Sequence, residues 1–306
     1  LKPEEWNPHI YWQPIPIHTV PLTKDVVLGA GATAPCALYD LETSRVEKSP
    51  AIKKITTHLS NMYKFVTEES GMEVYDFKTA MRLYDPLLIE DMYNFSLPSW
   101  TSSVYPEPLR EAALFSFVMP TWSPLQQRLK VGPLLGEIMK HFIEKRNGNL
   151  KPDRKLWMYS AHDMTIASVL NTFGSFDIQF PPYASSLLIE LRLKNDKHYV
   201  TMFYRNSTTQ KPYLLPIFEC NVLCPLDQFI SLVQPFVPAD WEEECNSVTL
   251  TSSGVPSDFA LILIAVLFSS VILLLALVVT CWIKKRRQNW YSNMKSSSEK
   301  DIPSQP

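Results

Sequence analysis

The sequence has 306 residues with a net charge of −2, and hydrophobic residues make up 46% of it. A chain of this length and composition can form one large domain, or two smaller domains, with a buried hydrophobic core. The hydrophobic content excludes a disordered chain. The near-neutral charge gives no basis for nucleic-acid binding. Glycine is scarce and no Gly-x-Gly-x-x-Gly or Walker loop occurs, so we expect neither a nucleotide nor another cofactor, and no bound metal.

The beginning of the chain carries two features. It starts with Leu1 and shows no signal-peptide pattern, which predicts a processed form or a fragment. Residues 11 to 21 then form an extended apolar strip in which Tyr11 and Trp12 precede alternating prolines. Such a strip is suited both to packing on the core and to an interface between subunits.

Helical spacing dominates the middle of the chain. Residues 51 to 70 and 107 to 118 are predicted to be helical, and the strongest helical pattern runs from about Ser123 to Lys145. Gly132-Pro133 should kink or split this last helix, and Asn147-Gly148 should stop it. We place a helical insertion at about residues 40 to 150.

Strand-like runs follow this helical region. They cover Leu156 to Tyr159, Ser186 to Leu193 and His198 to Arg205, and the last two flank a predicted hairpin turn at residues 194 to 197. Strands behind a helical middle predict an α/β core that carries the helical insertion.

A His-Asp pair follows the first of these runs and precedes another helical pattern. His162 and Asp163 would then lie at the carboxyl end of a buried strand and at the positive end of a helix, where open α/β sheets place ligand chemistry. Spacing alone equally allows Asp163 to be only a cap for the helix.

A membrane segment is predicted near the end of the chain. Residues 259 to 283 contain no charged residue, and a helix needs roughly 20 apolar residues to cross a bilayer. A buried core helix is the alternative, but globular helices rarely remain apolar on all faces. The basic residues 284 to 287 follow directly, which predicts a single-pass type I protein with residues 1 to 245 luminal or extracellular.

The remaining C-terminal segments are polar. Residues 246 to 258 are rich in Ser and Thr and predict a flexible stalk, and residues 284 to 306 form a short cytoplasmic tail. In the tail, Tyr291 and Met294 match the spacing of a sorting signal that clathrin adaptors bind, although this spacing is also common by chance.

Four cysteines lie outside the membrane segment, which contains Cys281. An even number in an oxidising compartment predicts two disulfides. Cys220 and Cys224 could be half of a zinc site, but no second close pair accompanies them, so we predict a local disulfide. Cys36 is then left to pair with Cys245. Asn94 and Asn206 begin glycosylation sequons, which the predicted topology makes accessible to glycosylation.

Six short segments of the chain are distinctive as a set. They are Tyr11 to Pro21, Tyr84-Asp85-Pro86-Leu87, Ser96-Leu97-Pro98-Ser99-Trp100, Tyr159-Ser160-Ala161-His162-Asp163, Pro181-Pro182-Tyr183-Ala184-Ser185 and Tyr204-Arg205-Asn206. Together they resemble the histidine acid phosphatases, most closely the prostatic and lysosomal branch. The resemblance runs from about residue 6 to Cys245, and its motifs are specific in combination. It implies a three-layer α/β sandwich of the phosphoglycerate-mutase type with a helical cap.

The resemblance implies a reaction and assigns roles in it. Members of this family hydrolyse phosphate monoesters at acid pH through a covalent phosphohistidine. His162 and Asp163 match the family's His-Asp motif. The resemblance therefore implies that His162 contacts the phosphate and that Asp163 is the general acid that protonates the leaving oxygen. These roles are chemically reasonable, because a cation stabilises the phosphoryl oxygens and an acid neutralises the departing alkoxide. In related enzymes the Trp-Gln-Pro-Ile-Pro segment lies near a homodimer contact, so the region from Trp12 to His18 is a candidate interface.

The sequence departs from the family at the nucleophile. The family uses the histidine of an Arg-His-Gly-x-Arg-x-Pro motif, and none of the six histidines here is preceded by Arg and followed by Gly. We therefore expect an N-terminally incomplete domain that is inactive alone. Two hypotheses follow, a membrane-anchored acid phosphatase whose N-terminal part is absent from this sequence, and a non-catalytic membrane glycoprotein on the same scaffold.

Overall fold

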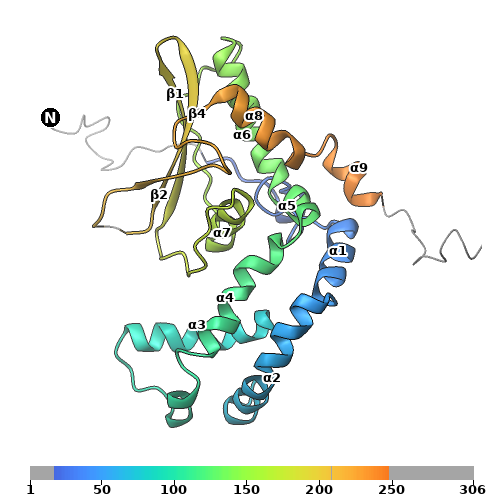
Figure 1. Cartoon of the computed structure of the whole chain (residues 1–306), viewed down its shortest axis with the longest axis vertical. Coiled ribbons are helices and arrows are strands. Elements are labelled where there is room, and N and C mark those ends of the chain that lie inside the picture. Colours follow the sequence, from blue (N-terminus) through green and yellow to red (C-terminus); the bar gives the residue numbers. More distant parts are fainter. Residues whose placement is uncertain (1–16, 208, 248–306) are drawn as a thin grey trace, which may run out of the picture. The chain divides into compact units, whose positions relative to one another are not determined.

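The structure, a computed structural model, describes residues 17–207 and 209–247. They belong to one compact unit, residues 1 to 248, and residues 249 to 306 form a second unit. Nine α-helices and four strands lie within the described residues (Figure 1). The α-helices are α1 (Ala37–Glu47), α2 (Pro50–Ser70), α3 (Phe77–Met92), α4 (Leu109–Val118), α5 (Pro124–Lys130), α6 (Gly132–Arg146), α7 (Asp163–Thr172), α8 (Leu226–Val233) and α9 (Trp241–Asn246). The strands are β1 (Ser186–Lys194), β2 (Lys197–Arg205), β3 (Tyr213–Leu215) and β4 (Cys224–Pro225), and short 3-10 helices cover η1 (Leu22–Lys24), η2 (Ser99–Ser103), η3 (Met119–Thr121) and η4 (Gln234–Phe236).

Local signals fix the ends of the predicted helices. The side chain of Ser49 caps α2, and Gly71 ends it with φ +69°, a conformation that glycine adopts readily. The predicted long helix is split into α5 and α6 at Val131, because Pro133 removes a backbone donor and fits only the first turn of the second helix. Asn147 and Gly148 end α6, as predicted.

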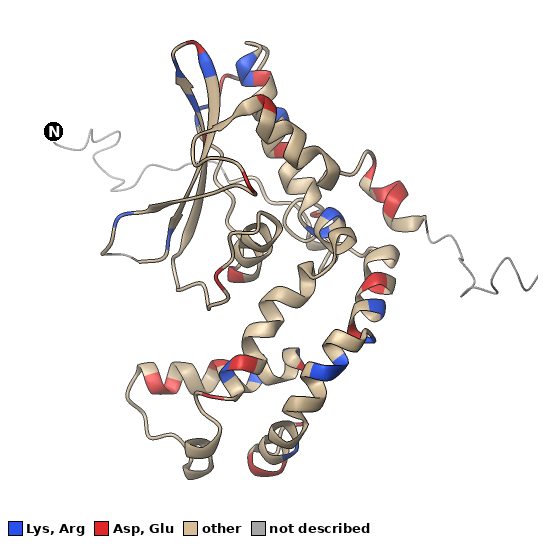
Figure 2. Ribbon diagram, in the orientation of Figure 1, with Lys and Arg blue, Asp and Glu red and all other residues tan. Residues whose placement is uncertain are grey.

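Helices α2, α3 and α4 lie in the same part of the molecule (Figure 1). They contribute to one hydrophobic cluster, whose buried side chains include Leu59 and Val66 of α2, Leu83 of α3 and Ala112 of α4. Acidic and basic residues are interspersed along these helices (Figure 2). No strand occurs between residues 37 and 146, so this stretch is entirely helical and loop.

A small antiparallel sheet forms the second cluster. β1 and β2 make a hairpin as predicted, and Asn195 and Asp196 in its turn have positive φ values of 51° and 58°. β3 and β4 both pair with β2. Alternate residues of β2, which are Val200, Met202 and Tyr204, are buried against side chains of α6, α7 and α8.

The strand predicted at Leu156 to Tyr159 is not formed. This segment has no ladder partner among the described residues, and Leu156 and Met158 are 72% and 82% exposed. The apolar run is typical of a buried strand, but a strand needs a neighbour that satisfies its backbone groups and covers its side chains. The described residues combine helices with a sheet, as predicted. All ladders of this sheet are antiparallel. The three-layer sandwich remains a prediction.

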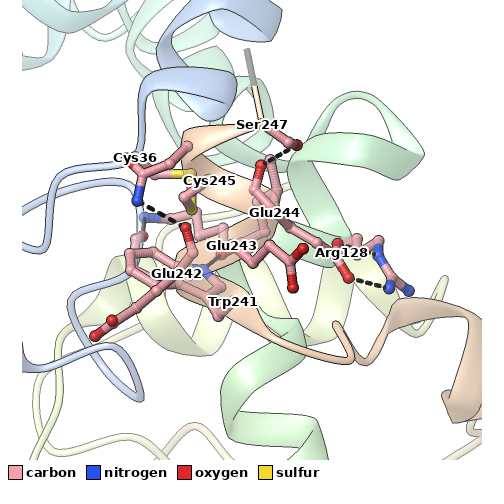
Figure 3. The surroundings of a disulfide bond; sticks show 12 residues. Cys36, Arg128, Trp241, Glu242, Glu243, Glu244, Cys245 and Ser247 are labelled. Atoms are coloured by element: carbon pink, nitrogen blue, oxygen red, sulfur yellow. Dashed lines mark hydrogen bonds and ion pairs between the residues drawn. A yellow bond between two sulfur atoms is a disulfide. The ribbon is translucent and has the colours of Figure 1, made fainter. Parts of the chain in front are cut away.

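Both predicted disulfides are formed. Cys220 is bonded to Cys224, and Cys36 is bonded to Cys245 with 4.7 Å between their Cα atoms, across 209 residues of sequence. The second bond joins the beginning of α1 to α9 (Figure 3). Beside it, Arg128 donates two hydrogen bonds to the carboxylate of Glu244, at 2.7 and 2.6 Å, and the indole of Trp241 donates to the Leu129 carbonyl at 2.7 Å.

The predicted membrane helix is not among the residues that the structure describes. Within residues 17–207 and 209–247, every helix is too short or too polar to span a bilayer. The predicted span at 259 to 283, the tail with Tyr291 and Met294, and all of the stalk beyond residue 247 lie outside the described residues.

Candidate active site

The His-Asp pair lies where the chain turns from an extended segment into α7. His162 is the N-cap residue, with φ −107° and ψ 162°, and Asp163 is the first residue of the helix. Both side chains are exposed to solvent. The backbone N–H groups of the first turn of α7 point towards this end of the helix, which favours negatively charged groups there.

Asp163 is held against its own helix. Its Oδ1 accepts a hydrogen bond from the backbone N–H of Met164 at 2.6 Å, and the backbone N–H of His162 donates to Thr165 Oγ1 at 3.4 Å. This arrangement orients the carboxylate at the helix terminus and leaves it open to solvent. It is compatible both with a capping role and with proton donation to a bound ligand.

Helix α6 anchors the extended segment that leads to the pair. The Tyr159 hydroxyl donates a hydrogen bond to the Glu137 carboxylate, and the Trp157 ring stacks on His141 with 4.2 Å between ring centres. Burial, followed by the bond to Glu137, raises the pKa of Tyr159, which therefore stays a neutral donor. These contacts fix the approach to His162 although no strand ladder supports it.

The opposite face of α7 is fixed by core contacts. Ala167, Val169 and Leu170 are buried, and the Asn171 amide donates to the carbonyl and the hydroxyl of Thr121 at 3.1 and 2.8 Å. The helix that carries His162 and Asp163 is therefore rigidly positioned, and the pair occupies its accessible end.

A hollow of about 100 Å³ opens beside His162. Three parts of the chain form its wall: the loop from Val27 to Ala32, the junction of α5 and α6 at Lys130 to Leu134, and the first turns of α7 from His162 to Val169. Lys130 and Ser168 line this hollow and are not among the predicted site residues. Neither carries a motif, and the three wall segments are far apart in the sequence.

The other predicted site residues are placed separately from the pair. Asn94 is exposed in a turn with φ 57°, and Asn206 is half-buried with its amide 3.5 Å from the Tyr213 hydroxyl. His18 is exposed, and Trp12 lies outside the described residues. Of the described residues, His18, Asn94 and Asn206 do not line the hollow beside His162.

Comparison with known proteins gives the family. Residues 58–205, which include His162 and Asp163, match the histidine phosphatase superfamily (branch 2). The chain is 36% identical to human prostatic acid phosphatase over 244 residues, which cover 78% of this chain and 62% of that protein. It is 30% identical to human lysosomal acid phosphatase over 289 residues, which cover 93% of this chain and 67% of that protein.

The chain therefore belongs to the histidine phosphatase superfamily, as its motifs predict, and its matched relatives are acid phosphatases. It spans less than two thirds of the length of the prostatic enzymes that it matches.

Proposed function

We propose that this protein provides part of the active site of an acid phosphatase that hydrolyses phosphate monoesters. In this proposal His162 contacts the phosphoryl group and Asp163 protonates the leaving oxygen. The observation that carries it is the exposed His-Asp pair at the rigidly held beginning of α7, in a chain of the histidine phosphatase superfamily.

The arrangement suits these two roles. The imidazole of His162, together with the positive end of α7, stabilises negative charge on the phosphoryl oxygens as it is redistributed in the transition state. A carboxylic acid beside it gives a proton to the departing alkoxide, so that the leaving group departs as a neutral alcohol. Because both residues are exposed, a substrate reaches them without any rearrangement of α7.

The third element of the reaction, a nucleophilic histidine in an Arg-His-Gly-x-Arg-x-Pro motif, does not occur in the 306 residues. We infer that these residues alone form no phosphohistidine and have little or no activity. The second candidate function, a non-catalytic membrane glycoprotein on the phosphatase scaffold, is favoured by this observation.

Hydrolysis near pH 5 separates the two functions. The 306-residue chain is compared with a fusion form, in which the nucleophile segment of human prostatic acid phosphatase is joined to its beginning. We expect activity only in the fusion form, and loss of most of it on His162→Gln. His58→Gln, which changes an exposed histidine of α2, is the matched control and should be neutral. If the folded fusion form is inactive, the non-catalytic function is favoured. If it is active and both substitutions have the same effect, the proposed role of His162 is wrong.

The proposal includes a location and assembly. We propose a single-pass type I protein in lysosomal, endosomal or surface membranes, anchored by residues 259 to 283 and sorted through Tyr291 and Met294 by clathrin adaptors. Residues 1 to 245 would be luminal or extracellular and glycosylated at Asn94 and Asn206. Trp12 to His18 would contribute to a homodimer. Glycosidase digestion of intact cells and vesicles tests the topology, since glycans on the cytoplasmic side would contradict it.

A further inference from the structure

Helix α3 ends differently from three other helices of the described unit. Helices α2, α6 and α7 end at or next to a glycine in the left-handed conformation, which is Gly71, Gly148 or Gly174, with φ of 69° or 70°. After α3 the left-handed residue is Asn94, with φ 57°. Glycine adopts this conformation more readily than asparagine does, so the turn by itself does not explain the asparagine.

Two backbone hydrogen bonds close the turn at Asn94. The N–H of Asn94 donates to the Asp91 carbonyl at 2.9 Å, and the N–H of Phe95 donates to the Glu90 carbonyl at 2.9 Å. This is the pattern of a Schellman motif, in which the residue after the left-handed one folds back towards the last turn of the helix. Phe95 is therefore directed towards the part of α3 that contains Ile89.

Apolar side chains surround Asn94 on this turn. Ile89, Met92, Tyr93 and Phe95 are between 37% and 71% exposed, and we call these four residues the α3-end patch. Residues three and four apart are neighbours on a helix, so Ile89 lies beside Met92 and Tyr93. The chain leaves α3 at the edge of the helical region and continues in an outlying loop towards η2 (Figure 1). Clustered apolar exposure of this kind is typical of a surface that a partner covers.

A possible cover is attached at the centre of the patch. Asn94 is the first residue of the sequon Asn94-Phe95-Ser96, and both Asn94 and Ser96 are exposed. A sugar joined to Asn94 would begin among the four apolar side chains. One face of a sugar ring consists of C–H groups, which pack on apolar and aromatic side chains while the hydroxyl groups stay in water.

The charge at this turn favours a sugar over a second copy of the chain. Glu90 and Asp91 are exposed beside the patch, and no ion pair within residues 17–207 and 209–247 neutralises either of them. A symmetric contact between two copies would bring the carboxylates of both together, and like charges repel. An uncharged oligosaccharide meets no such repulsion.

We propose that an N-linked glycan on Asn94 packs its first N-acetylglucosamine on the α3-end patch and covers it. The glycan is attached by a bond from the Asn94 amide nitrogen to C1 of the sugar, with loss of one amide proton and of the lipid diphosphate that carried the oligosaccharide. This cover rests on the luminal topology in the proposed function, and it deepens that proposal by giving the glycan a structural role.

Substitutions of Ser96 test the cover, because they control the sugar without changing Asn94. The full 306-residue chain is produced in mammalian cells that make only oligomannose glycans, which an endoglycosidase then trims to one N-acetylglucosamine. Ser96→Ala removes the sequon, and Ser96→Thr is the matched control that retains it. Mass spectrometry first measures the occupancy of Asn94, which we expect to be high in the unsubstituted chain and in Ser96→Thr.

Hydroxyl-radical labelling then measures how accessible the side chains of the patch are to solvent. We expect Met92, Tyr93 and Phe95 to be labelled about twofold more in Ser96→Ala than in Ser96→Thr, because the sugar no longer excludes water from them. Met158, which is 82% exposed in the segment before His162, is the internal control and should be labelled equally in both.

Thermal unfolding isolates the contact with the aromatic ring. Loss of the sugar through Ser96→Ala should lower the melting temperature by about 2–4 °C. In Phe95→Gln, which keeps the sequon, adding Ser96→Ala should produce less than half of this shift. Tyr75→Gln changes another exposed aromatic residue and is the matched background, in which the full shift should remain.

Three results would overturn the proposal. They are an unmodified Asn94, equal labelling of the α3-end patch with and without the sugar, and protection of the patch only where chains associate, which would make it an interface between copies. Sugar on Asn206 alone would overturn the cover and leave the luminal topology intact, whereas sugar on neither asparagine would contradict the topology as well. Hydrolysis by the fusion form is measured separately, so the proposed phosphatase activity can fail while the cover stands.

Discussion

At Gly132 the backbone passes so close to the segment after α8 that no side chain fits between them. A Cβ atom there would lie 2.1 Å from the Phe236 carbonyl oxygen and 2.8 Å from Cδ of Pro238. Gly132 is also the first residue of α6. Side chains of this helix contact Tyr159 and Trp157, which lie in the extended segment that leads to His162. A single backbone contact thus fixes the helix that supports the candidate site.

Gly132→Ala should lower the free energy of unfolding by about 1–3 kcal/mol, because the clash is with backbone that cannot move aside cheaply. Gly136→Ala is the matched control on the same helix, where the new Cβ would meet a methyl group of Val237 at 2.9 Å. A side chain can shift, so its effect should be smaller. Thermal unfolding of both variants measures this, and equal melting temperatures would contradict the close approach.

At the scale of elements, α9 is held to α5 by the ion pair of Arg128 and Glu244 (Figure 3). Both side chains are 27% exposed, and Glu244 also accepts a hydrogen bond from the Ala239 backbone. The hydrogen bonds from Arg128 lower the pKa of Glu244. The carboxylate therefore remains charged at the mildly acidic pH at which the proposed enzyme would work.

A glutamate with a lowered pKa stabilises the fold above its unfolded-state pKa, and this contribution is lost as the pH falls through its folded-state pKa. Glu244→Gln should therefore cost roughly 1–2 kcal/mol of stability at pH 7 and at every pH above the unfolded-state pKa of a glutamate. Below that pKa the cost should shrink, and it should disappear once the pH is below the folded-state pKa of Glu244. Glu242→Gln, an exposed neighbour on α9, should be neutral throughout. Melting curves of the three proteins between pH 3 and pH 7 test this, and a cost for Glu244→Gln that does not depend on pH would exclude the ion pair as its cause.

For the whole described unit, the bond between Cys36 and Cys245 closes a loop of nearly the entire domain. Its 209-residue separation contrasts with the 4 residues between Cys220 and Cys224. In the chain-entropy model, a longer closed loop restricts the unfolded chain more and stabilises the fold more. The bond also attaches α9, the last described helix, to α1.

Replacing both Cys36 and Cys245 by serine should cost about 2–5 kcal/mol of stability. The same change at Cys220 and Cys224 should cost less, because their loop is short. Denaturant unfolding of both double variants gives the comparison, and an equal or larger loss for the short loop would show that loop closure is not the dominant effect.

The sequence predicted those elements whose signals are local. Ser49 and Gly71 delimit α2, and the β1–β2 hairpin turns at Asn195-Asp196. Helix α3 was not predicted, since Pro86 within it usually ends a helix. The apolar run from Leu156 to Tyr159 was assigned to a strand, but strand formation depends on a partner that the run itself does not specify.

In the candidate site, too, some residues could be predicted from the local sequence and others depend on how the helices pack. His162 and Asp163 are adjacent in the sequence and match a family motif, so they could be predicted from the sequence, and their roles stay a prediction. Lys130 and Ser168 meet at the hollow only because α5 and α7 pack together, and neither residue is distinctive in its own segment. The two cysteine pairs were predicted by elimination, and the structure confirms both.

The most direct test of the central claim is the leaving-group dependence of Asp163→Asn in the fusion form. If Asp163 is the general acid, hydrolysis of an alkyl phosphate should fall by about 10²–10⁴-fold, because an alkoxide leaves poorly without a proton. Hydrolysis of p-nitrophenyl phosphate should fall much less, since its leaving group is stable as an anion. Equal losses for the two substrates, or no loss for either, would contradict the role of Asp163 as proton donor.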